Sequence, residues 1–201
     1  MKQDWRPVPL EIGVLAGKTG TTEYTLRYPK TPEGSTAFDR WWLRETELLR
    51  RRCARIQEPW PVRVSSEWQE TLQCPRAISG FVDISRQSGY AGWQLKRISA
   101  TFFPGERGPV PLSALLLPGL LPRLLPRVEA AVLDMTRQAE TPFYRSAEKK
   151  ALKALPEGGY YLTGEGLAIW LPQETIAPAN GGLPTVLLPY ESLKGLLRFS
   201  F

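Results

Sequence analysis

Alternating hydrophobic and polar positions dominate the first half of the chain. Four stretches have strand character: residues 10–28, 62–73, 77–86 and 93–103. A Gly/Thr turn divides the first stretch, so we expect an N-terminal β-hairpin with Tyr24, Leu26 and Tyr28 on one face of its second strand. The other three stretches follow one another closely, which favours a meander.

Helical periodicity replaces this alternation in three segments. The longest is AFDRWWLRETELLRRRCARI, residues 37–56, with Ser35 or Thr36 as the expected N-cap. Its apolar positions recur about every 3.6 residues and form one stripe: Phe38, Trp42, Leu49, Cys53 and Ile56. Residues 120–138 and 146–155 predict two further helices, and residues 104–119 a loop with a short helical turn.

The closing segment reads as strand again. YYLT and LAIWL flank the glycine turn GEG, the loop QETIAPANGGLP leads to the strand TVLLPY, and ESLKGLL predicts a short helix. We expect this segment to complete the sheet.

The fold class predicted is α+β, with a mixed, mainly antiparallel sheet, an N-terminal β-hairpin and three to four helices packed on it. Residues 1–201 are interpreted as a single domain, and a division into two sub-lobes that share one core, at about 8–105 and 106–201, is left open.

Hydropathy and charge constrain the setting of the protein. No apolar run approaches the roughly 20 residues that cross a bilayer, so no transmembrane segment is expected. The start MKQDWRPVP lacks the apolar stretch of a secretory signal, which leaves a cytoplasmic protein or the loss of a signal or anchor as alternatives. The net charge of +6 permits anionic partners. The arginines of LRRRCARI point in three directions on a helix, and we expect no specific nucleic-acid binding.

The absence of histidine shortens the list of chemistries. With none in the sequence, Ser-His-Asp and Cys-His nucleophilic sites and HExxH zinc sites are excluded. The glycine clusters do not form a phosphate loop, and Cys53 and Cys74 have no metal-ligand spacing. We expect buried, unpaired thiols, no metal, no cofactor and no enzymatic activity. The exception kept open is an enzyme that acts on glycans with carboxylates alone.

The seven tryptophans suggest recognition instead. They are Trp5, Trp41, Trp42, Trp60, Trp68, Trp93 and Trp170. Most are expected in the core, whereas one or two displayed at the surface could stack on sugar rings or bases.

Several motifs together resemble the RsiV/PdaC-like domain family, a bacterial family largely of unknown function. The C-terminal aromatic strand, glycine turn, LAIWL, IAP, glycine pair and LLPYESLKGLL match its closing part. Upstream, YPKTPEG with the helix of Phe38 and Trp42, then ISGFVDISRQSGYAG and GPVPLSALL, follow its order, so the resemblance spans residues 9–198. The family commonly has a Gly-Gly-Ala-His turn where this chain reads GYAGWQ, and no role of that histidine is carried over.

The resemblance implies recognition at the cell envelope. The family includes the extracellular domain of the anti-sigma factor RsiV, which senses lysozyme, and the N-terminal domain of the peptidoglycan deacetylase PdaC. We therefore expect a non-enzymatic binding or sensing module for a cell-wall glycan (peptidoglycan) or a wall-acting protein such as lysozyme. The alternative is an intracellular structural or regulatory protein of the same fold with a protein partner. Nothing in the sequence defines an oligomeric state.

Two loops are the candidate ligand contacts. Loops on a rigid sheet commonly carry specificity. The first is the turn from Gly89 to Trp93 and the second the segment 173–182; the candidate residues are Tyr90, Trp93, Gln173, Glu174 and Asn180. The alternative is that both are only well-packed connections.

Overall fold

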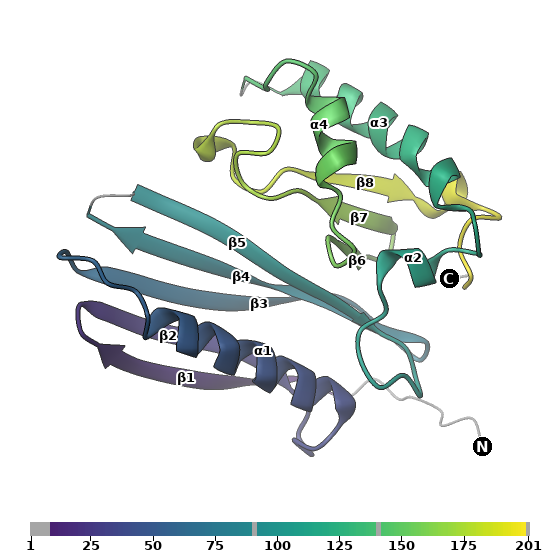
Figure 1. The fold of residues 1–201 in the computed structure, drawn as a ribbon. Helices are drawn as coiled ribbons and strands as arrows, with labels where there is room; N and C mark the ends of the chain where they lie inside the picture. The colour runs from purple at the N-terminus through teal and green to yellow at the C-terminus, as the bar shows by residue number, and fades with distance from the viewer. Residues whose placement is uncertain (1–8, 90–91, 140–141, 200–201) are drawn as a thin grey trace.

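The computed structural model describes residues 9–89, 92–139 and 142–199. The first half forms a five-stranded sheet of order β1-β2-β3-β4-β5 (Figure 1). Its strands are β1 (Glu11–Thr19), β2 (Thr22–Lys30), β3 (Val62–Cys74), β4 (Ala77–Ser88) and β5 (Gly92–Phe102). All neighbours are antiparallel except β2 and β3, which run parallel. The predicted hairpin and meander are both confirmed.

Helix α1 (Ala37–Cys53) makes the crossover between the two parallel strands. It packs mainly on β2, and its apolar stripe buries Phe38, Trp42 and Cys53 against one face of the sheet. Of the two expected N-caps, Thr36 is the one used: its hydroxyl accepts from the Asp39 N–H, while the Asp39 carboxylate accepts from the Thr36 N–H. This reciprocal cap fixes where the helix begins.

The second half corrects one expectation. The closing segment does not complete the first sheet but forms a separate antiparallel one, of order β6-β7-β8. Its strands are β6 (Tyr160–Leu162), β7 (Gly166–Trp170) and β8 (Thr185–Pro189). Two contacts explain the separation. The Leu162 N–H is donated to the Ser79 hydroxyl on the face of the first sheet, and the Leu95 N–H of the edge strand β5 is donated to the Gln173 side chain.

The remaining helices accompany the second sheet (Figure 1). They are α2 (Leu112–Leu115), α3 (Leu121–Gln138) and α4 (Ala147–Ala154), with the 3₁₀ turns η1 (Ala179–Gly181) and η2 (Tyr190–Leu193). Four α-helices and a mixed, mostly antiparallel main sheet confirm the α+β fold class. Among the described helices, none has both the length and the apolar character needed to cross a bilayer.

Buried side chains gather in two clusters. One lies between α1 and the first sheet and includes Leu26, Trp42 and Val82; the other surrounds the second sheet with α3 and α4 and includes Leu124 and Ile169. Cys53 is buried, as expected, whereas Cys74 is only half-buried, and both are free thiols in the described part of the chain. The interpretation as one domain, with or without two sub-lobes, stays a prediction.

Candidate ligand-binding face

The face of the first sheet opposite α1 is polar and only partly covered. Since side chains alternate between faces, the odd-numbered residues of β4 and β5 point away from the helix. Near Ser79 and Ser99 this face carries the second sheet, because both hydroxyls bond to its backbone, at Leu162 and Gly158. Toward the turn between β4 and β5, the face is open.

Two cross-strand rows form the open part, which we call the Trp93 face. The strand register aligns Glu23 with Arg63, Arg63 with Gln87, and Gln87 with Trp93. The neighbouring row is Thr25, Ser65 and Ser85. These seven side chains lie around a hollow of about 290 Å³. The site therefore combines one large aromatic ring with charged groups, an amide and three hydroxyls.

Trp93 has a strongly exposed side chain, with 58% of its surface accessible to solvent. Trp60, at 56%, is equally exposed but does not line the hollow. It approaches the same end of the sheet, since a Cβ placed on Gly89 would lie 3.7 Å from the Trp60 Cβ. The expectation that one or two tryptophans are displayed fits these two residues, while Trp42 is almost fully buried at 1%.

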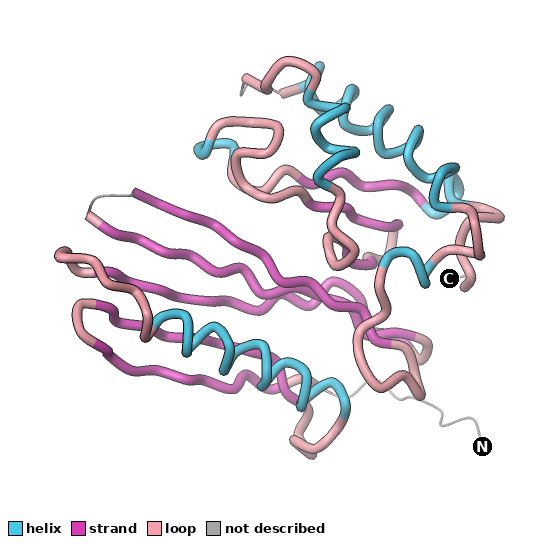
Figure 2. The backbone as a smooth tube through the Cα atoms, viewed as in Figure 1, coloured by secondary structure: helices cyan, strands magenta, loops and turns pink. Residues whose placement is uncertain are grey.

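The second candidate loop, residues 173–182, is tied to strand β5. It runs between β7 and β8 as a long connection with one short helical turn (Figure 2). Gln173 joins it to β5: its Oε1 accepts from the Leu95 N–H at 2.8 Å, and its Nε2 donates to the Ala179 carbonyl at 2.8 Å. Both ends of this amide make a hydrogen bond, so Gln173 ties the loop to β5.

The other predicted site residues differ in setting. Glu174 is exposed and has a left-handed backbone with φ of 64°, and Asn180 is exposed on η1. Tyr90 lies outside the described residues. Of the five candidates, the structure places Trp93 in a hollow and Gln173 two strand positions away at Leu95. Their roles in binding stay predictions.

Sequence reasoning missed the polar partners of Trp93. Arg63, Ser65, Ser85 and Gln87 come from strands that were interpreted only as scaffold. Their signal was present, because they occupy the polar positions of two alternating strands. What the sequence did not supply was the register that aligns them.

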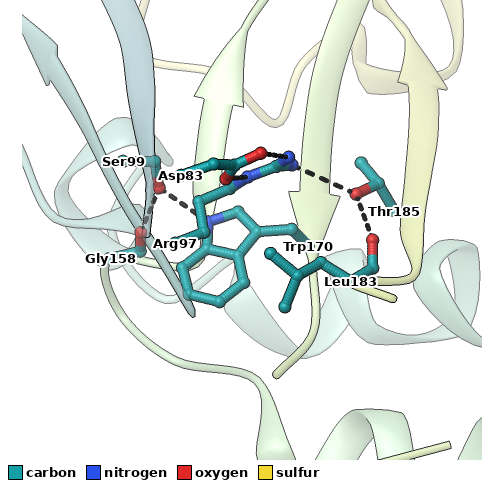
Figure 3. Close-up of polar contacts among 7 residues, drawn as sticks. All are labelled: Asp83, Arg97, Ser99, Gly158, Trp170, Leu183 and Thr185. Atoms are coloured by element: carbon teal, nitrogen blue, oxygen red, sulfur yellow. Dashed lines mark hydrogen bonds and ion pairs between the residues drawn. The ribbon is translucent and has the colours of Figure 1, made fainter. Parts of the chain in front are cut away.

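A charged seam borders the Trp93 face where the second sheet begins (Figure 3). The Arg97 guanidinium donates to both oxygens of Asp83, at 2.6 and 2.7 Å, and lies 3.6 Å from the centre of the Phe81 ring. Its Nη1 also reaches the Thr185 hydroxyl at 3.5 Å. Nearby, burial raises the pKa of Tyr161 although Arg97 opposes the shift.

The same seam ties the second sheet to the first through Trp170. Its indole Nε1 donates to the Ser99 hydroxyl at 2.7 Å, and that hydroxyl donates to the Gly158 carbonyl at 2.5 Å (Figure 3). A buried indole is thus fully satisfied. The seam fixes one boundary of the open face.

The hollow places one aromatic ring among hydrogen-bonding side chains. Within residues 9–89, 92–139 and 142–199, no three acidic, cysteine or histidine side chains come together as metal ligands. Glu23 is the one carboxylate among the described residues that line the hollow. An aromatic platform with surrounding hydrogen-bonding groups is a common design of small-ligand sites.

Comparisons with known proteins place the fold. No family model matches the chain, and no curated protein matches it. Among solved structures, it is similar to a DUF3298 family protein from Pseudomonas aeruginosa PAO1, with a TM-score of 0.70 and 16% identity over 96% of both chains. It is also similar to a DUF3298 family member from Bacteroides fragilis, with a TM-score of 0.64 and 11% identity over 96% of this chain and 95% of that one. The chain therefore has the fold of DUF3298 family proteins.

Proposed function

We propose that this protein is a non-enzymatic binding or sensing module of the RsiV/PdaC-like type that recognises a cell-wall glycan through the Trp93 face. The similarity in fold to DUF3298 proteins, the family in which RsiV/PdaC-like domains are placed, supports the general type. The glycan is inferred from the chemistry of the face.

The observation that carries the proposal is the exposed Trp93 ring beside a polar hollow. Pyranose rings have apolar C–H faces that stack on indole, and a ring of hydroxyl groups that needs donors and acceptors. Arg63 supplies donors, Glu23 acceptors, and Gln87 both. The exposed indole keeps apolar surface in contact with water, so a sugar that covers it adds a favourable burial free energy.

A binding role fits the charges better than hydrolysis does. Glycoside hydrolysis commonly uses two carboxyl groups on opposite sides of the scissile bond. The described lining has the single carboxylate of Glu23, whose neighbour in the row is Arg63. Among the described residues, the lining therefore lacks the second carboxyl group that this chemistry uses.

The proposal predicts that Trp93→Ala removes binding to wall material. Loss of a central stacking tryptophan typically lowers binding free energy by about 2 kcal/mol, or about thirty-fold in Kd. The measurement is co-sedimentation with insoluble peptidoglycan in low and in high salt, since binding by the net charge alone is screened by salt. Soluble N-acetylglucosamine oligosaccharides, titrated by tryptophan fluorescence, give the Kd.

Trp60→Ala is the matched control, because Trp60 is equally exposed and lies outside the hollow. Salt-resistant binding lost in Trp93→Ala and kept in Trp60→Ala supports the glycan. Equal binding by both variants and the unaltered chain would count against the Trp93 face. If peptidoglycan is not bound but added lysozyme is retained, the partner is a wall-acting protein. If the protein binds neither peptidoglycan nor lysozyme, the result favours the alternative of an intracellular protein with a protein partner.

A further inference from the structure

A second cavity lies on the other face of the first sheet, beside α1. Its apolar walls come from Leu49 and Cys53 on the helix, Ile56 just after it, and Ile84 and Ile98 on β4 and β5. We call it the α1 pocket. Its volume is about 290 Å³, near the lower end of the range for small-molecule sites, about 300–1,000 Å³.

The pocket exists because α1 does not cover the whole sheet. The helix packs mainly on β2 and ends at Cys53, whereas β4 and β5 lie two and three strands away (Figure 1). Ile84 and Ile98 therefore have the helix on one side only. The sheet therefore has apolar side chains on this face at positions that the helix does not cover.

Positive charge surrounds the pocket. Arg52, Arg86 and Lys96 line it, while the Arg97 guanidinium is turned to the opposite face, where it pairs with Asp83. Glu58 forms an ion pair with Arg86 and offsets one of these three charges. The Arg86 Nε and the Glu58 Oε2 are both buried without a hydrogen-bond partner among the described residues, so this pair satisfies its own groups only in part. Arg52 and Lys96 are the two cations of the lining that Glu58 does not offset.

We infer that the α1 pocket binds a single-chain amphiphile with a carboxylate head group, with the alkyl chain between Leu49, Ile84 and Ile98 and the carboxylate among Arg52, Arg86 and Lys96. The apolar walls select the alkyl chain, because each methylene group that leaves water for an apolar site adds a favourable transfer free energy. The charges select the head group, because a guanidinium matches a carboxylate in shape and charge.

This site is independent of the Trp93 face. Arg86, Gln94, Lys96 and Ile98 occupy even-numbered positions of β4 and β5, whereas Gln87 and Trp93 occupy odd ones. The two sites are therefore on opposite sides of the same sheet. Failure of one proposal leaves the other standing.

The test is isothermal titration calorimetry of the whole chain with sodium decanoate below its micellar concentration. We expect saturable binding of one decanoate per chain, lost when the pocket is filled by Leu49→Trp or by Ile98→Trp. Lys96→Glu should weaken binding about fivefold. The matched control is Lys149→Glu on α4, which makes the same charge change at an exposed lysine in the second half of the chain.

Cys53 provides a second readout, because this buried thiol lines the pocket. In a Cys74→Ser background it is the single thiol, and decanoate should slow its reaction with a thiol reagent at least fivefold. The proposal is overturned if decanoate shows no saturable binding, if decyltrimethylammonium binds as well, or if folded filling variants bind like the unaltered chain. Circular dichroism confirms that each variant is folded.

Discussion

Replacing Asp39 by alanine is expected to lower the free energy of unfolding by about 3 kcal/mol. The carboxylate is buried at 4% exposure and serves two segments at once. Its Oδ1 accepts from the Thr31 N–H at 2.5 Å, and its Oδ2 accepts from the Thr31 hydroxyl at 2.7 Å and from the Thr36 N–H at 2.8 Å. Alanine leaves these donors without an acceptor and removes half of the reciprocal cap of α1.

Urea unfolding followed by circular dichroism measures this loss. The matched control is Asp134→Ala on α3, where the carboxylate is 66% exposed and forms a surface ion pair with Arg137. That change should stay within about 0.5 kcal/mol. Equal effects of the two substitutions would show that the cap contributes nothing beyond a surface charge.

The same carboxylate predicts a dependence of stability on pH. Burial opposes the charged form of Asp39, but the hydrogen bonds from Thr36 and Thr31 together outweigh it and hold its pKa below the ordinary value of 3.8. A group whose pKa is lower in the folded state adds stability at pH above its unfolded pKa. That contribution should decline as the pH falls below about 3.8, and Asp39→Asn should remove this part of the decline.

The local elements of this fold were predictable because each is encoded within a few residues. The alternation of Tyr24 and Leu26 specifies a strand, and the stripe of Phe38 and Trp42 specifies a buried helix face. The start of the helix was specified to within one residue, at Ser35 or Thr36. The structure confirms all of them. These patterns are predictive because the residues that form each of them are close both in sequence and in space.

Pairing between distant segments was not predictable in this way. The parallel register that aligns Glu23 with Arg63 depends on how far α1 carries the chain back along the sheet. The separate second sheet depends on side-chain hydrogen bonds, such as that of Gln173 with Leu95, which no periodicity reveals. The contact of Gln173 with a ligand stays a prediction, and the structure adds that this half-buried side chain links the loop to β5.

The candidate sites illustrate the same limit. Trp93 was chosen because it follows a glycine turn, and the structure places it in a hollow. Its partners Arg63 and Gln87 stand 30 and 6 positions before Trp93. Arg63 reaches the same hollow because it is paired with Gln87, which is paired with Trp93, so their convergence is a property of strand register. The α1 pocket is a property of what a helix leaves uncovered, and a sequence pattern does not contain it.

Replacing Arg97 by alanine is expected to destabilise the protein by about 3 kcal/mol, because several interactions end together. Its side chain is only 11% exposed, binds both oxygens of Asp83 and lies on the Phe81 ring. Alanine leaves Asp83 unpaired at the edge of the second sheet and removes the contact to Thr185. We expect a lower urea midpoint, while Arg63→Ala on the same face should change it little, since Arg63 is exposed.

A double-mutant cycle separates the ion pair from the packing of Arg97. If the pair itself stabilises the seam, Asp83→Ala combined with Arg97→Ala should be less harmful than the sum of the two, with a coupling energy of about 1–2 kcal/mol. Additive effects would assign the stabilisation to the Phe81 and Thr185 contacts instead.

An ion pair that holds the seam also makes a functional prediction. Asp83→Ala should loosen the second sheet near β5 and so weaken glycan binding at Trp93, although Asp83 is not among the residues that line the hollow.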